Sequence, residues 1–337
     1  MAEVKKEGVI LRQTDLDFEN DGVLNPAVWQ EGNTVHLFYR AVRKGNYSSI
    51  GYCKLNGPLK IAERMNTPFL SPQFDYEKHG MEDPRIVKID DLYYLSYVAF
   101  DDENALGALA TSTNLQHFDR KGIIVPQISY DDFDLLTKNN TTLNEKYLRY
   151  NRGAKILADK DFVFFPRRIN GKLTFLHRIK PDIQIVSVSS LNELTDEFWK
   201  DYFSHFEEHI FLSPKFAHEV SYVGAGCPPV ETPNGWLVLY HGVKDTVKGY
   251  QYSCCAALFD LNAPQKEIAR LSYPLFKPEL EYELMGDVDD VCFPTGTALF
   301  GDVLYIYYGA ADELIACACV QLSALLEELT SLSKCKL

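Results

Sequence analysis

The stretch Met81-Glu82-Asp83-Pro84-Arg85-Ile86 places two acids, a proline and an arginine directly before a strand-like run. The run continues as Val87-Lys88-Ile89, turns at Asp90-Asp91 and resumes as an aromatic segment over residues 92–98. Because proline has no backbone N–H, we expect the carboxylates at the start of the strand and not in its middle. A carboxylate held there beside a fixed arginine can act as a catalytic acid, although a structural Asp–Arg turn would give the same pattern.

The same arrangement recurs along the chain and decides the expected fold. Each copy has a start marked by Pro or Gly, a short strand, a tight turn, an aromatic strand and one more strand-like run. The copies lie at residues 25–55, 83–111, 154–188, 227–259 and 293–320. Turns such as Asn170-Gly171 and Gly301-Asp302 between apolar runs are typical of β-hairpins. Repeated meanders of this kind predict an all-β chain that forms a five-bladed β-propeller, with residues 1–337 as a single domain.

Three segments lie outside this pattern. Residues 190–206 carry apolar side chains near helical spacing, and we expect a helix there with Ser190 as its cap. Residues 322–329 predict a helix at the C-terminal end of the repeats. Residues 130–150 are polar and rich in Asn, and we expect an inserted loop.

Composition narrows the function class. The net charge of −13 and the pI near 5.1 argue against a nucleic-acid surface and against an anionic membrane as partner. The aromatic fraction of 13% fits β structure and also carbohydrate sites, where rings stack on sugars. The N-terminal residues contain no apolar signal core, so we expect a soluble, cytoplasmic protein.

Cysteine usage agrees with a reducing compartment. No CxxC pair occurs, and several cysteines lie within strand-like apolar runs. We therefore expect buried free thiols in place of a disulfide or metal site. The cysteines are at positions 53, 227, 254, 255, 292, 317, 319 and 335.

A propeller brings residues from every inner strand to one axial mouth, so the polar residues at the starts and ends of strands are candidates for one shared site. These candidates are Asn25, Arg40, Arg43, Asp83, Arg85, Arg168, His241 and Asp312. Each has an alternative interpretation when taken singly. His241 also fits a buried strand histidine, Arg40 and Arg168 fit solvated strand ends, and Asp312 fits a turn.

At these residues the chain resembles glycoside hydrolase family 130, whose members are five-bladed propellers acting on β-mannosides. The resemblance spans residues 25–320. It rests on ordered motifs, which are Asn25-Pro26-Ala27-Val28, Phe38-Tyr39-Arg40-Ala41, Glu82-Asp83-Pro84-Arg85, Gly224-Ala225-Gly226-Cys227-Pro228-Pro229, Gly235-Trp236-Leu237, Tyr240-His241-Gly242-Val243 and Tyr307-Tyr308-Gly309-Ala310-Ala311-Asp312.

The resemblance implies inverting phosphorolysis of a terminal β-mannosyl linkage, β-1,2 or β-1,4, that releases α-mannose 1-phosphate. Asp83 would be the general acid, acting through a sugar hydroxyl, and the mannosyl unit would be held by Asn25, Arg40 and Asp312. Phosphate would be bound by Arg168, His241 and Tyr252. The partners would be the oligosaccharide and inorganic phosphate as co-substrate, with no metal or other cofactor, no nucleic acid and no membrane, and with homo-oligomerisation left open.

Two alternatives remain at this point. The family also contains β-1,2-mannosidases, which carry Glu within the Gly-Ala-Gly stretch and Asn in place of the histidine of Tyr-His-Gly. This chain keeps Gly224 and His241, which favours phosphorolysis.

One departure from the family pattern points the other way. The pair Glu103-Asn104, where phosphorylases often have Arg before Asn, leaves one expected phosphate contact unmatched.

Water attack would need a base, for which Glu219 and Glu231 are the nearest candidates. The second alternative is a non-catalytic sugar-binding propeller, which would need the aromatic residues and Arg40 but not Asp83.

Overall fold

The computed structural model of the protein describes residues 2–137, 147, 150 and 155–334, and in this part of the chain the fold is all-β. The strands form four hydrogen-bonded sheets among the described residues. The widest sheet contains two antiparallel groups joined by a single parallel pair between Ser48 and Gly80. The first group is β2 (Gly22–Glu31), β3 (Thr34–Arg43), β4 (Tyr47–Asn56) and β5 (Lys60–Arg64). The second is β6 (Gly80–Ile89), β7 (Leu92–Phe100), β8 (Ala105–Ser112) and β9 (Asp119–Ile123).

The other three sheets repeat the same antiparallel meander. One contains β10 (Lys160–Phe164), β11 (Leu173–Arg178), β12 (Ile183–Val188) and β13 (Ile210–Leu212). The next contains β14 (Tyr222–Ala225), β15 (Val230–Thr232), β16 (Gly235–Thr246), β17 (Gly249–Phe259) and β18 (Glu267–Arg270). The last contains β19 (Cys292–Phe300), β20 (Val303–Ala310), β21 (Leu314–Gln321) and β1 (Val4–Leu11). The predicted repeats therefore correspond to successive strand groups.

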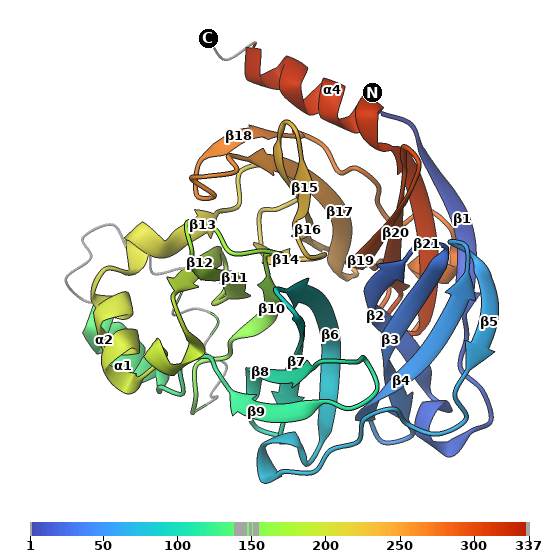
Figure 1. Ribbon diagram of the computed structural model, residues 1–337, viewed down its shortest axis with the longest axis horizontal. Coiled ribbons are helices and arrows are strands. Elements are labelled where there is room, and N and C mark those ends of the chain that lie inside the picture. The colour runs from blue at the N-terminus through green and yellow to red at the C-terminus, as the bar shows by residue number, and fades with distance from the viewer. Residues whose placement is uncertain (1, 138–146, 148–149, 151–154, 335–337) are drawn as a thin grey trace.

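The first strand of each group lies nearest the middle of the molecule, as Figure 1 shows for β2, β6, β10, β14 and β19. These strands contact one another across the groups: β2 packs against both β6 and β19, and β10 packs against β6 and β14. Residues that are far apart in sequence but equivalent within their groups are thus collected in one central region.

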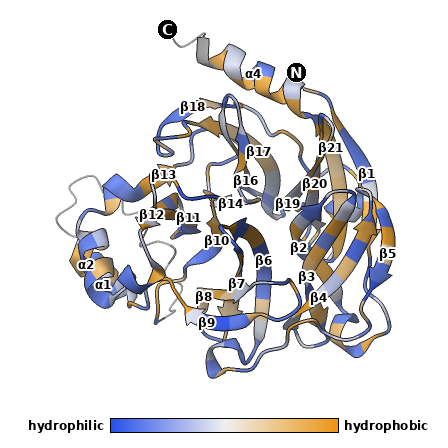
Figure 2. Cartoon of the chain, viewed as in Figure 1, coloured by the Kyte–Doolittle hydropathy of each residue, from blue (hydrophilic) through white to orange (hydrophobic). Residues whose placement is uncertain are grey.

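Neighbouring groups pack face to face through apolar residues. Apolar residues recur along strands such as β3 and β4 (Figure 2), and both strands are buried over most of their length, as expected where neighbouring groups cover both faces of a sheet. The core between the first and last groups, for example, combines Leu37 and Leu55 with Tyr307 and Cys317, all fully buried. Burial of such apolar surface is the main stabilising term for these sheets.

The N-terminal strand completes the C-terminal sheet. β1 pairs antiparallel with β21, and the helix α4 (Leu322–Lys334) follows β21 directly. Glu328 of α4 accepts hydrogen bonds from the backbone of Ala2 and from the hydroxyl of Tyr273. The first described residues of the chain therefore lie beside α4, as Figure 1 shows.

The helical predictions were correct in place but not in detail. The segment 190–206 forms a 3₁₀ turn (Leu191–Glu193) followed by α2 (Asp196–Ser204). Ser190 caps the 3₁₀ turn, and Thr195 caps α2 by accepting from the backbone of Phe198. The predicted loop at 130–150 was partly wrong, because residues 130–137 form α1 (Tyr130–Thr137), which buries Phe133 against Phe203 and Phe206. Residues 138–146, 148 and 149 of that prediction lie outside the described residues.

The cysteines within the described ranges are free and buried, as predicted from their spacing. They are Cys53, Cys227, Cys254, Cys255, Cys292, Cys317 and Cys319, and Cys335 lies outside the described residues. Burial raises the pKa of the Cys227 thiol to about 12. Within the described part of the chain, no helix has both the length and the apolar character that crossing a bilayer requires.

Candidate active site

The predicted acid Asp83 lies inside β6 and not at its start, which corrects the sequence-based expectation. Glu82 pairs with Val98 and Arg85 pairs with Ser96, so Asp83 and Pro84 together oppose a single residue of β7. This is a β-bulge, and a bulge tolerates proline because its extra residue makes no ladder hydrogen bond. The backbone of Asp83 takes φ 46°, a left-handed conformation that Asp and Asn adopt more readily than other non-glycine residues.

The same bulge occurs in the inner strands of three consecutive groups. In β2 the residues Asn25 and Pro26 lie between the pairs Leu24–Arg40 and Ala27–Phe38, and Asn25 has φ 49°. In β10 Asp161 lies between the pairs Lys160–Arg178 and Val163–Leu176, with φ 53°. Each bulge directs one polar side chain toward the same central region, so the position of the site follows from the repeated strand geometry.

The pair Glu82-Asp83 is held by residues from the strand groups on either side of it. The side-chain amide of Asn25 donates to Asp83 Oδ1 at 2.7 Å, and the guanidinium of Arg40 lies 3.9 Å from the same oxygen. Arg40 also donates to Glu82 Oε1 at 2.7 Å, while Lys160 Nζ lies 3.3 Å from Glu82 Oε2. The network therefore brings together Asn25, Arg40 and Asp83, which the sequence predicted as one site.

Arg85 fixes the backbone of this bulge. The residue is 1% exposed, and its guanidinium donates to the carbonyl oxygens of Asp83 and Pro84 at 3.0 and 3.1 Å. It also donates to the carbonyl of Gly226, which lies on the fourth strand group. Because these acceptors are main-chain atoms, Arg85 secures the path of the strand and leaves the Asp83 carboxylate available.

Two cavities flank this network. The first has a volume of about 480 Å³ and lies between the first and last groups. Its polar wall includes Asn20, Asp21, Arg40, Asn46, Asp287 and Asp312. Asp312 follows β20 in a left-handed turn with φ 51° and lines the same cavity as Arg40. Carboxylates, amides and a guanidinium around one cavity offer the donors and acceptors that sugar hydroxyls require.

The second cavity differs in chemistry. It has a volume of about 260 Å³ and is lined by the tyrosines at positions 130, 147, 150, 222, 250 and 252, together with the cations Lys160, Arg178 and Lys180. The predicted residue Tyr252 lies here, and its hydroxyl is hydrogen-bonded to that of Tyr222. Lys180 Nζ lies 3.9 Å from the centre of the Tyr222 ring. Converging cations and phenolic hydroxyls of this kind suit an anion.

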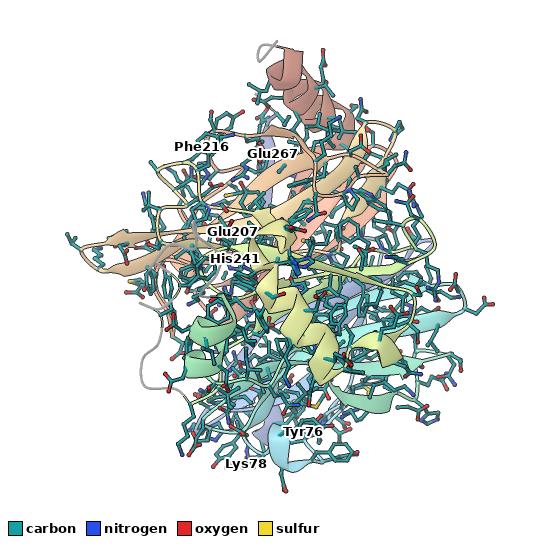
Figure 3. All side chains as sticks on the ribbon, turned by 90° about the vertical axis from the view of Figure 1, so that its left-hand side faces the viewer. Tyr76, Lys78, Glu207, Phe216, His241 and Glu267 are labelled. Atoms are coloured by element: carbon teal, nitrogen blue, oxygen red, sulfur yellow. The ribbon has the colours of Figure 1, made fainter. Side chains whose placement is uncertain are left out.

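His241 adjoins the second cavity and is fully buried; Figure 3 labels it in the interior of the molecule. Its Nε2 lies 3.2 Å from Arg178 Nη1, and its ring lies 5.9 Å from the ring of Tyr252. A guanidinium can only donate, so Nε2 accepts and the ring proton resides on Nδ1. Burial and then the charges of Arg178, Arg85 and Lys180 lower the pKa of His241 well below its usual value. His241 is therefore a neutral donor, not the cation that phosphate binding by charge would suggest.

The structure does not bring Arg168 to this cluster. Arg168 lies beyond the far end of β10, where it donates to Asp90 Oδ2 at 3.1 Å and to the carbonyl of Ser189 at 3.1 Å. Arg178 of β11 stands beside His241 in its place. Arg43, another candidate, is half-exposed and stacks on the ring of Tyr47 at 4.8 Å.

Lys160, Asp161 and Arg178 were missed in the sequence, although the repeats contain the signal. Lys160-Asp161 of the third repeat is equivalent to Glu82-Asp83 of the second. Arg178 is opposite Lys160 in the way that Arg40 is opposite Leu24. A residue-by-residue alignment of the repeats would have placed all three at the site.

The two carboxylates named as bases for water attack are engaged elsewhere. Glu219 is fully buried, accepts from Tyr240, and lies 3.3 Å from Arg270. Glu231 forms a two-pronged pair with Arg167 at 2.8 Å on the surface. Glu103 is exposed in the turn after β7, where its backbone N–H donates to Asp101.

The two aspartates nearest Arg40 have opposite electrostatic environments. Burial alone would raise the pKa of Asp83, but Arg40, Lys160 and Arg85 together lower it below its usual value. Burial, together with the negative charge of Asp83, raises the pKa of Asp312 to about 6. Without ligands, Asp83 is thus ionised at neutral pH, while Asp312 gains its proton only in mildly acidic solution.

The raised pKa of Asp312 predicts a pH-dependent effect on stability. The folded protein holds this proton up to about pH 6, whereas the unfolded chain releases it near pH 4, so the contribution of Asp312 to stability falls as the pH rises through this window. Asp312→Asn removes the titration, and the asparagine tolerates the same φ. The unfolding free energy of the variant, relative to wild type, should increase by about 1–3 kcal/mol between pH 4 and pH 7.

This difference can be measured by denaturant unfolding at several pH values. Asp90→Asn is a suitable control, because Asp90 is an exposed aspartate at φ 55° outside the site. If the stability of the Asp312 variant relative to wild type were the same at pH 4 and at pH 7, the raised pKa of Asp312 would be contradicted.

Comparisons with known proteins extend these observations. The family model of glycoside hydrolase family 130, described as beta-1,4-mannooligosaccharide phosphorylase, matches residues 11–331. A 1,2-beta-oligomannan phosphorylase of Thermoanaerobacter sp. (strain X514) is 32% identical over 324 residues, covering 93% of this chain and 95% of the relative. A beta-1,2-mannobiose phosphorylase of the same strain is 32% identical over 319 residues, covering 90% and 92%.

The fold is shared with solved structures. The complex of beta-1,2-mannobiose phosphorylase from Listeria innocua with beta-1,2-mannobiose superimposes with a TM-score of 0.75 at 24% identity, covering 98% of this chain and 99% of that chain. The family model and the relatives agree along nearly the whole length of the sequence. The chain belongs to glycoside hydrolase family 130.

Proposed function

We propose that the protein is an inverting β-mannoside phosphorylase, which cleaves a terminal β-mannosyl linkage with inorganic phosphate and releases α-mannose 1-phosphate. The observation that carries this proposal is that the partners of the Glu82-Asp83 pair, Arg40 and Lys160, line two chemically different cavities. Arg40 of the hydroxyl-binding cavity and Lys160 of the cationic cavity both interact with the Glu82-Asp83 pair. One carboxylate with a sugar site on one side and an anion site on the other is what phosphorolysis requires.

In this proposal the mannosyl unit occupies the first cavity, where Asn25, Arg40 and Asp312 contact its hydroxyls. Phosphate occupies the second cavity, bound by Lys160, Arg178, His241 and Tyr252. A phosphate oxygen attacks the anomeric carbon from the face opposite to the leaving group. The bond from that carbon to the glycosidic oxygen breaks, and Asp83 supplies a proton to this oxygen through a sugar hydroxyl.

The lowered pKa of Asp83 fits this order of events. Lys160, which after Arg40 does most to keep Asp83 ionised, also lines the phosphate cavity. A bound phosphate dianion would offset the charge of Lys160 and raise the pKa of Asp83, so that the acid takes up its proton once the co-substrate is present. Proton uptake and nucleophile binding would then be coupled through the same lysine.

Hydrolysis on the same scaffold needs a second carboxylate to activate water. Glu219 and Glu231 are bound to Arg270 and Arg167 and do not meet this need. A sugar-binding protein without catalysis would have no use for the proton donor or for a cationic cavity beside it. Both alternatives are therefore less well supported than phosphorolysis.

The architecture and linkage are part of the proposal. The strand groups are interpreted as the blades of a five-bladed propeller in a single domain, with the widest sheet counted as two blades joined at Ser48 and Gly80.

The β-1,2 linkage is favoured, because the two relatives that align with at least 90% of the chain carry that linkage in their names.

The direct test is to incubate the protein with β-1,2-mannobiose and β-1,4-mannobiose, each with and without phosphate, and to assay mannose 1-phosphate and free mannose. Mannose 1-phosphate should form from the β-1,2 disaccharide and only when phosphate is present. Full-rate release of free mannose in phosphate-free buffer would refute phosphorolysis and support the hydrolase alternative.

Asp83→Asn should remove most activity while leaving the fold intact. The amide cannot donate the proton as an acid does, and a positioned general acid contributes about 10²–10⁴-fold to the rate. Asparagine tolerates the backbone of φ 46° at this position, so the melting temperature should change little. Asp90→Asn is the matched control, and turnover of the Asp83 variant close to that of the control would exclude Asp83 as the acid.

Arg178→Ala should raise the KM for phosphate far more than the KM for the mannoside. A charge-assisted hydrogen bond to phosphate is worth about 1.5–3 kcal/mol, which corresponds to roughly a tenfold to hundredfold change. Arg168→Ala should leave both constants near wild type, because Arg168 is bound to Asp90 and Ser189.

Arg178→Lys retains a positive charge beside Asp161 and can replace the alanine variant in this measurement if the alanine variant does not fold. Its phosphate KM should lie between those of wild type and the alanine variant. A larger phosphate effect from Arg168→Ala than from either Arg178 variant would reverse the assignment.

A further inference from the structure

Asp161 is a buried carboxylate to which the reaction outlined above gives no role. It is 3% exposed and lies at the third of the equivalent bulges, where Asn25 and Asp83 occupy the other two. Asn25 and Asp83 bind each other, whereas Asp161 Oδ2 lies 2.8 Å from Arg178 Nη1 and 3.5 Å from His241 Nε2. The third bulge thus directs its side chain to the residues beside the cationic cavity.

The surrounding backbone makes room for this triad. Gly224 of β14 pairs with His241, and a Cβ atom on Gly224 would lie 2.2 Å from Asp161 Oδ2 and 2.3 Å from His241 Nε2. Real Cβ atoms do not approach other heavy atoms this closely, so any side chain at position 224 would displace Asp161 or His241. The absence of a side chain at Gly224 is therefore a requirement of the triad.

Arg178 has few other groups to fix its orientation. Its guanidinium lies 5.2 Å from the centre of the Tyr222 ring, and within the described residues its Nε is buried without a hydrogen-bond partner. His241 Nδ1, which carries the ring proton, is likewise buried and unpaired within that part of the chain. Unpaired buried donors are costly, and two of them beside one cationic cavity indicate a ligand that accepts hydrogen bonds.

We propose that Asp161 is a positioning residue for the phosphate co-substrate. Its ion pair holds the guanidinium of Arg178, which in turn donates to His241 Nε2, so that the free donors of Arg178 and His241 are oriented toward the anion. This inference rests on the proposed function, since it assigns the cationic cavity to phosphate. Asp161 does not touch the sugar or the phosphate itself. Its effect is transmitted through Arg178 and His241.

The sign of the effect separates this role from simple electrostatics. If Asp161 acted only through its charge, removing that charge would strengthen phosphate binding, because like charges repel. If Asp161 positions Arg178 and His241, removing the charge weakens phosphate binding although the site becomes more positive. The two interpretations predict opposite changes in the same constant.

Asp161→Asn is the informative variant. Asparagine has the same shape and tolerates the backbone of φ 53°, so the bulge should form as in wild type. The KM for phosphate should rise about tenfold, the loss expected when one charge-assisted hydrogen bond is misaligned. The KM for the mannoside should stay within about twofold of wild type, because the first cavity is unaffected.

A binding measurement without turnover completes the test. Inorganic phosphate should raise the melting temperature of wild type and of the Asp90→Asn control, and should raise that of Asp161→Asn only at higher concentration. A phosphate KM in Asp161→Asn that is unchanged or lower than in wild type would overturn the inference.

The experiments distinguish a failure of the proposed phosphorolysis from a failure of the positioning role of Asp161. A wild-type protein that is stabilised by phosphate but releases mannose in its absence would contradict phosphorolysis, and the melting shifts would still report on Asp161. A wild-type protein that phosphate does not stabilise at millimolar concentration would overturn the positioning role itself. Each outcome can therefore be assigned to one of the two proposals.

Discussion

The site depends on a backbone constraint, which is the left-handed bulge repeated in β2, β6 and β10. A bulge rotates one residue out of the regular alternation, so a polar side chain can face the centre without its neighbours losing their places in the core. The bulge needs φ near 50°, which asparagine and aspartate accept and β-branched or bulky residues do not. The need for a polar side chain at the centre and the need for a left-handed backbone therefore select the same residue types at Asn25, Asp83 and Asp161.

Placing several charges in one buried region has an energetic consequence. Taking an ion out of water costs several kcal/mol, and the cost is offset only when a partner and hydrogen bonds are supplied. Here Glu82 is shared by Arg40 and Lys160, and Asp161 is paired with Arg178. The pairs of Glu82 with Arg40 and Lys160 join different strand groups, whereas the pair of Asp161 with Arg178 lies within one group. The buried charges therefore keep their partners only while the strand groups stay aligned.

The sequence predicted the strand repeats, because each is marked by a local motif, and it named Asn25, Arg40, Asp83 and Asp312 from such motifs. It placed Asp83 at a strand end, since a proline inside a strand is recognisable as a bulge only when the register of the partner strand is known. It named Arg168 and missed Arg178, although both follow aromatic runs, because only the pairing of β10 with β11 places Arg178 opposite Lys160 at the centre. Tertiary register was the missing information in both cases.

The pairing of β1 with β21 has a consequence for how the protein is made. The strands from β2 to β18 can find their partners in order as the chain leaves the ribosome, because their contacts are local in sequence. The last sheet contains both the first strand and the last, so it cannot be completed until synthesis has reached β21. Since Arg40 is synthesised early and Asp312 late, the cavity that both residues line forms only after the last strands have been made, and a chain truncated before β20 would contain Asp83 but not this cavity.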